Sequence, residues 1–207
     1  MQIYLSISGS RKVQGFAKEH ECGWCLTPDN HRQVPNGPYF IDNGAFSAWK
    51  NKTKFNPDPF FRLSKKYPDF DFAVWPDIPH GGPESLHYSY TMLKYREEVP
   101  GPIYLAVQGG TTMNDVQVVI DHFDGIFIGQ PLSWKFNTAQ MWAGLAHLHG
   151  KKCHAGGIGT WEGFVHMHCC GVDSVDTTTQ SRHQDDSHIR KYLDHLRCQS
   201  NLEEATA

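Results

Sequence analysis

The segment "IYLAVQGGTTMNDVQVVIDHFDGIFIGQ", residues 103–130, decides the fold. It begins and ends with short apolar runs, at 103–110 and 125–130, in which apolar residues follow one another instead of alternating with polar ones. Such runs are typical of parallel strands that are buried on both faces. Between them, residues 112–123 have a helical pattern, and Thr112 can cap its N-terminus. The segment therefore predicts a strand–helix–strand unit with parallel strands.

The same alternation continues along the whole chain of 207 residues. We expect strands at 3–8, 23–27, 39–43, 72–77, 103–110, 125–130, 152–159 and 174–179. We expect helices at 58–68, 82–99, 112–123, 137–150, 160–171 and 186–199. Eight strands that alternate with helices predict an α/β protein, a minimal single-domain (β/α)8 TIM-like barrel over residues 1–200. A doubly wound open sheet is the alternative, and residues 201–207 are expected to form a disordered tail.

The composition is that of a globular protein, with 39% hydrophobic and 20% charged residues. The formal charge of -3 excludes a global basic field, so any contact with nucleic acid must come from a local patch. The apolar runs are far shorter than the ~20 residues that span a bilayer, and the N-terminus has no signal-peptide pattern. We therefore expect a cytoplasmic protein without membrane contact, whose six cysteines are reduced thiols.

Two short tracts have the residue types of metal or redox sites, "CGWC" (22–25) and "HMHCC" (166–170). A CxxC pair without a second ligand pair is a weak signal. The second tract falls on an expected helix, which would point its potential ligands to different faces. We expect no metal site, although the residues alone leave metal binding by either tract open.

Polar residues and glycines end six of the expected strands, and the active site of a (β/α)8 barrel lies at these C-terminal ends. A single aspartate there would be explained as a helix cap, whereas three acids and a glutamine on different strands favour a site. Two carboxylates can divide the roles of nucleophile and proton shuttle. A further Asp and a Gln can hydrogen-bond a planar ligand that carries amide groups, and an aromatic ring can stack on it. These residues are Asp42, Asp77, Gln108, Asp176 and Phe46.

Five segments within residues 39–182 resemble, in order, the motifs of the tRNA-guanine transglycosylase superfamily. They are "IDNGAF" (41–46), similar to DSGGF/Y; "AVQGG" (106–110), similar to VQGG; "GIFIGQ" (125–130), similar to AIGG; "GGIGT" (156–160), similar to MGVGT; and "GVDSVDTTTQSR" (171–182), similar to GVDMFDCVLPTR.

The resemblance implies a role for each matching residue. Asp176 matches the nucleophile that attacks the anomeric carbon, and Asp42 matches an acid that takes part in proton transfer. Asp77 matches the carboxylate that binds the Watson–Crick edge of the base. The other residues expected at the base are Gln108, Gly129, Phe46, Asn43 and Gly157, and those expected at the nucleic acid are Arg182, His183, Lys52 and Lys54.

Three differences from the family pattern affect what the resemblance implies. Asn43 replaces a serine, and Gly156 replaces a methionine that covers the base, so one side of the site is expected to be looser. After Asp176 only one cysteine follows, Cys198, so the zinc subdomain of the tRNA enzymes is expected to be absent. The chain thus looks closer to the compact deazapurine DNA-modification transglycosylases of phages and bacteria.

The function that this resemblance implies is the replacement of guanine in DNA by a 7-deazaguanine such as preQ0, without a cofactor. Pairing with a second copy or with a partner subunit stays open. The alternatives are the same exchange on tRNA, a hydrolytic N-glycosidase and a non-catalytic subunit that binds nucleic acid. A phosphate-sugar barrel enzyme is a further alternative, because "HAGGIGT" (154–160) could hold a phosphate group.

Overall fold

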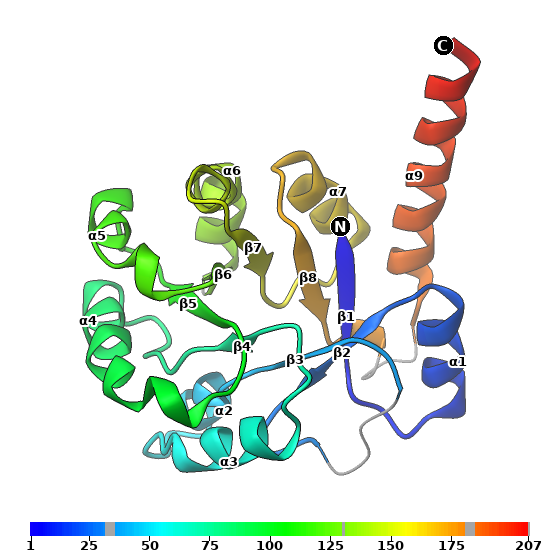
Figure 1. Cartoon of the computed structure of the whole chain (residues 1–207). Coiled ribbons are helices and arrows are strands. Elements are labelled where there is room, and N and C mark those ends of the chain that lie inside the picture. The colour runs from blue at the N-terminus through cyan, green and yellow to red at the C-terminus, as the bar shows by residue number, and fades with distance from the viewer. Residues whose placement is uncertain (32–35, 130, 181–184, 207) are drawn as a thin grey trace.

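Eight parallel strands form a closed barrel in chain order, surrounded by helices (Figure 1). The computed structural model describes residues 1–31, 36–129, 131–180 and 185–206, and side chains as far as Cys198. The strands are β1 (Gln2–Ser6), β2 (Gly23–Leu26), β3 (Tyr39–Ile41), β4 (Ala73–Val74), β5 (Ile103–Val107), β6 (Gly125–Ile128), β7 (Lys152–Ala155) and β8 (Ser174–Thr177). The pairing of β8 with β1 closes the sheet, so the predicted (β/α)8 barrel is confirmed over the open sheet.

Helices follow the strands around the outside. They are α1 (Arg11–Glu19), α2 (Ala45–Lys50), α3 (Asp58–Lys66), α4 (Pro83–Met92), α5 (Met113–Gln117), α6 (Leu132–Leu148), α7 (Trp161–Cys169) and α9 (Ser187–Thr206), with 3-10 helices η1 (Leu93–Glu98) and η2 (Ile120–His122). The sequence did not predict α1 or α2; α2 is short and buries only Ala45, whereas α1 buries Val13, Phe16 and Ala17 and was missed. It also placed the start of α6 too late, since Asn137 lies inside the helix and Pro131 precedes its first turn.

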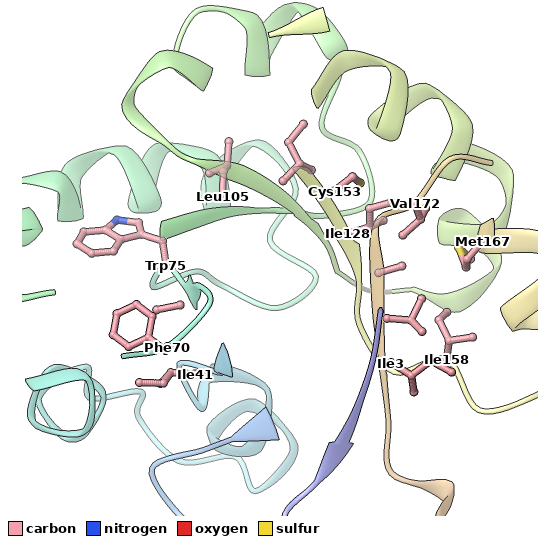
Figure 2. Close-up of a cluster of buried hydrophobic side chains, with 14 of the residues drawn as sticks. Ile3, Ile41, Phe70, Trp75, Leu105, Ile128, Cys153, Ile158, Met167 and Val172 are labelled. Carbon is pink, nitrogen blue, oxygen red and sulfur yellow. The ribbon is translucent and has the colours of Figure 1, made fainter. Parts of the chain in front are cut away.

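Side chains of the strands alternate between two cores. On β5, Ile103, Leu105 and Val107 point outward and pack against the helices, whereas Tyr104 and Ala106 point into the barrel. Figure 2 shows part of the outer core, with Leu105 among side chains that fill the space between strands and helices. Each strand is therefore buried on both faces, which explains its continuous apolar sequence.

The inside of the barrel is filled by aromatic rings that pack against glycines. Tyr4 and Tyr104 are both buried and point inward. A Cβ atom at Gly23 would lie 2.4 Å from the Tyr4 ring, and one at Gly125 would lie 2.5 Å from the Tyr104 ring. Only glycine fits opposite these rings, so pairing large and small residues lets eight short strands close around a solid interior.

The last helix, α9, lies beside α1 and α7 (Figure 1). The Arg190 guanidinium lies 4.9 Å from the Phe16 ring centroid, and the Tyr192 hydroxyl lies 3.1 Å from His168 Nδ1. The disorder expected for residues 201–207 stays a prediction. Among the described residues, we find no helix with the length and apolar character that crossing a bilayer requires.

Candidate functional site

Three of the predicted site residues extend inward-facing rows of side chains to the C-terminal end of the barrel. Gln108 lies two positions after the inward-facing Ala106, and Asp42 lies two positions after the inward-facing Phe40 of β3. Asp176 pairs in register with Tyr4, another inward-facing residue. Because neighbouring parallel strands keep the same facing, these polar groups meet at the mouth of the barrel, above its aromatic interior.

Asp77 is held by two amide side chains from the neighbouring strand ends. Asn43 Nδ2 donates to Asp77 Oδ1 at 2.8 Å and to the Trp75 carbonyl at 2.9 Å, while Gln108 Nε2 donates to Asp77 Oδ2 at 2.6 Å. The Gln108 carbonyl oxygen in turn accepts from the backbone N–H of His80 at 3.3 Å. Burial raises the pKa of Asp77 to about 6, although both amide bonds favour the charged form. This fixed carboxylate keeps further acceptor positions for a ligand.

The surroundings of Asp42 disfavour the charged form of its carboxyl group. Burial raises the pKa of Asp42 to about 7, and the charges of Asp176 and Asp77 add to the effect. A bond of 2.7 Å from the Gly44 N–H to Asp42 Oδ1 acts in the opposite direction. Gly44 makes this turn at a φ of 81°, which favours glycine. Asp42 thus lies within electrostatic reach of both Asp176 and Asp77.

Asp176 is held through one of its two carboxylate oxygens. His154 Nε2 lies 3.1 Å from Asp176 Oδ1, and the Gly157 N–H donates to the same oxygen at 3.0 Å. The other ring nitrogen of His154 lies 2.8 Å from the Ser174 hydroxyl. Burial lowers the pKa of His154, so the neutral ring donates from Nε2 to Asp176 and accepts from Ser174. Both donors engage Oδ1, whereas no hydrogen bond to Oδ2 is found among the described residues.

A buried lysine supports the turn that binds Asp176. Lys135 on α6 is 1% exposed, and its Nζ donates to the Gly156 carbonyl. Burial lowers the pKa of Lys135 to about 8. A Cβ at Gly156 would lie 2.4 Å from the Phe127 ring, which fills the space beside this glycine, and the looser base site stays a prediction. Lys135 and Phe127 thus fix the turn from which Gly157 donates.

Gly129 lies against the amide of Gln108. A Cβ atom at position 129 would approach Gln108 Nε2 to 2.6 Å, so glycine is needed for this amide to reach Asp77. The structure therefore groups Gly129 with the predicted base-binding residues. Arg182 and His183, predicted to contact nucleic acid, lie outside the described residues.

Phe46 and the predicted lysines lie on and after α2, next to Asp42 in the chain. Phe46 stacks on Trp49 with ring centroids 5.6 Å apart, and 43% of Phe46 is exposed. Lys52 and Lys54 are exposed. These residues thus form an open rim outside the acids, of which Asp77 is buried and Asp42 and Asp176 are half-buried.

Sequence reasoning missed His154, Ser174 and Lys135. The first two had a usable signal. His154 on β7 lies two positions before Gly156, and Ser174 on β8 lies two positions before Asp176. That period of two places all four on the inner face. Lys135 gave no signal, since its burial depends on how α6 packs over the β7 turn.

Neither cysteine- and histidine-containing tract gathers three potential metal ligands, although His166 Nε2 and Cys170 Sγ of the second tract lie 3.5 Å apart. Cys22 packs in the outer core and Cys25 in the inner one, on opposite sides of the barrel wall. His166 contacts the Phe136 carbonyl at 2.8 Å, whereas His168 contacts Tyr192. Within the described ranges, no group of three or more His, Cys, Asp or Glu residues could hold a metal ion.

No protein-family model matches this chain, and no curated protein matches it. The motifs and the geometry of the site are therefore what indicate a function.

Proposed function

We propose that this protein is a base-exchange transglycosylase that replaces guanine in DNA with a 7-deazaguanine through a covalent Asp176 intermediate. The observation that carries the proposal is the single-oxygen anchoring of Asp176 by His154 and Gly157, at the end of the barrel that also holds Asp42. Asp42, Gln108, Gly129, Gly157 and Asp176, one from each of the five motifs that resemble guanine transglycosylases, come from this same end of the barrel.

In the first half-reaction, Asp176 Oδ2 attacks C1′ of the target nucleotide. The bond between C1′ and N9 breaks, and the guanine leaves with the electron pair of that bond. Asp42, whose pKa is raised to about 7 by burial, supplies the proton that this leaving group takes up. The product is a glycosyl ester on Asp176.

In the second half-reaction, the incoming 7-deazaguanine loses its N9 proton to the Asp42 carboxylate. Its N9 then attacks C1′ and displaces Asp176, whose Oδ1 regains full carboxylate charge beside its two hydrogen-bond donors. Asp42 returns to its protonated form, so the cycle is balanced and needs no cofactor.

Recognition of the base is assigned to the cluster around Asp77. The carboxylate accepts from the N–H groups of the guanine edge, and Gln108, whose Nε2 donates to Asp77, is assigned to the carbonyl oxygen of the base. Asn43 holds Asp77 in place from the other side. Guanine and 7-deazaguanine share this edge, so one set of contacts serves both bases.

The experiment is base exchange measured with the full chain, DNA carrying labelled guanine, and preQ0 as the incoming base. We expect label release that requires preQ0, appearance of deazaguanosine in the nucleoside mass spectrum, and loss of both in Asp176→Asn. Asp121→Asn is the matched control, because its side chain is 86% exposed, and it should exchange like the wild type.

Other outcomes would assign a different function. Exchange on tRNA but not on DNA would identify the tRNA reaction, and guanine release that needs no incoming base would identify an N-glycosidase. DNA binding without base release by the wild type would identify a non-catalytic subunit. Exchange by Asp176→Asn at the wild-type rate would contradict the assigned nucleophile.

A further inference from the structure

Three aromatic rings gather at the rim, directly after the segments that carry two of the acids. Phe46 and Trp49 lie on α2, which follows Asp42, and His80 follows Asp77. The Trp49 ring centroid lies 5.6 Å from that of Phe46 and 4.5 Å from that of His80. Trp49 is 49% exposed, so this ring cluster of Phe46, Trp49 and His80 presents aromatic surface to solvent.

Positive charge is concentrated beside the ring cluster. Residues 43–57 include Lys50, Lys52 and Lys54 and contain no acidic residue, although the whole chain has a formal charge of -3. All three lysines are exposed. A local cationic patch on an acidic protein is suited to a polyanion.

The backbone of the rim is also unusual. Lys52 and His80 have φ angles of 53° and 61°, a left-handed conformation that is uncommon for residues other than glycine. Such residues occur often at functional sites. The N–H of His80 donates to the Gln108 carbonyl oxygen, which connects the ring cluster to the Asp77 site.

We propose that the ring cluster and its three lysines bind an unpaired stretch of DNA next to the target nucleotide, with a neighbouring base stacked on Trp49. Bases in a duplex already have both faces covered, whereas a single strand can stack its bases on exposed aromatic side chains. Lysines that alternate along the segment can follow the phosphates of such a strand. The choice of DNA rests on the proposed function, and the protein would then act on single-stranded or locally opened DNA.

The test is fluorescence anisotropy with the full chain and a labelled oligonucleotide as single-stranded DNA, as duplex DNA and as RNA of equal sequence. We expect single-stranded DNA to bind tightest and Trp49→Ala to weaken its binding about 5- to 150-fold, the range for one stacked base. Trp49→Phe keeps a ring and should restore most of the affinity. Tyr90→Ala is the control, because Tyr90 is 47% exposed and also packs against a histidine, His122, and it should bind like the wild type.

Charge is tested separately. The double variant Lys52→Glu/Lys54→Glu should lower affinity and flatten its dependence on salt, whereas Lys18→Glu on α1 should leave both unchanged. The proposal is overturned if duplex DNA or RNA binds as tightly as single-stranded DNA, or if Trp49→Ala binds like Tyr90→Ala. Because binding needs no exchange, tight single-stranded binding without base exchange would support this surface and contradict the proposed function. Base exchange by the wild type, together with unaltered single-stranded binding by Trp49→Ala, would support the proposed function and contradict this surface.

Discussion

Replacing His154 with phenylalanine tests the reaction geometry most directly. The side chain is fully buried, and its ring stacks on Phe127 with centroids 5.1 Å apart and an interplanar angle of 13°. Phenylalanine keeps a ring in this position but removes the bonds to Asp176 and Ser174. The perturbation is therefore the loss of one of the two donors on Asp176 Oδ1.

The magnitude follows from the charge on that oxygen. A hydrogen bond to a charged group contributes about 1.5–3 kcal/mol, which corresponds to about 10- to 150-fold in a rate or an equilibrium. In the glycosyl ester, Oδ1 is a weakly charged carbonyl oxygen, and it becomes a carboxylate oxygen again when Asp176 departs. In the proposed mechanism, the His154 donor therefore assists the second half-reaction. In His154→Phe, exchange should slow by that factor and the covalent adduct should accumulate.

The assay combines steady-state exchange with denaturing electrophoresis of the enzyme trapped on DNA. KM for the incoming base should change little, because Asp77 and Gln108 are untouched. His154→Gln, which restores an N–H donor, should recover part of the rate. His147→Phe is the matched control, since it removes a 2.9 Å contact with Asp173 outside the site. Less adduct in His154→Phe than in the wild type, with its fold and DNA binding intact, would refute this role of the histidine.

Three further predictions concern the acids and the glycine beside Gln108. Asp42→Asn should slow exchange about 10²- to 10⁴-fold and abolish the change of rate with pH near pH 7. If the rate of the variant still changes near pH 7, that titration belongs to another group. Burial raises the pKa of Asp42 to about 7 and that of Asp77 to about 6, so the unfolded chain loses these two protons at a lower pH than the folded chain does. The free energy of unfolding should therefore fall from pH 4 to pH 7, as measured by urea titration. The fall should be weaker in Asp42→Asn, which has only one of the two acids. A parallel decline in both proteins would contradict that linkage. Gly129→Ala should displace Gln108 and raise KM for the base with a smaller effect on kcat, and an unchanged KM would remove Gln108 from base recognition.

The barrel could be predicted from sequence because its strands are buried on both faces. The runs at 103–110 and 125–130 contain apolar residues for the inner and the outer core in turn, as the structure confirms. Helices were predicted less well where little is buried. On α2, only Ala45 is fully buried, so no periodic pattern marks this helix in the sequence.

The site was predictable where the chemistry sits at a strand end and unpredictable where it depends on packing. Asp42, Gln108 and Asp176 follow the apolar runs directly, and the barrel brings them together. Lys135 reaches the site from a helix, across the turn at Gly156, and that contact depends on the angle at which α6 packs. No local pattern encodes such an angle, because it is set by side chains from several distant segments.

The placement of the acids argues for a reaction over a purely structural role. Burial raises the pKa of both Asp42 and Asp77, so ionising either acid at neutral pH destabilises the folded chain. An amide in place of Asp42 could accept the Gly44 N–H without that penalty. A fold selected only for stability would favour the amide, whereas proton transfer requires an acid whose pKa lies near the working pH. The raised pKa of Asp42 is thus unfavourable for stability but is the property that the proposed exchange of bases uses.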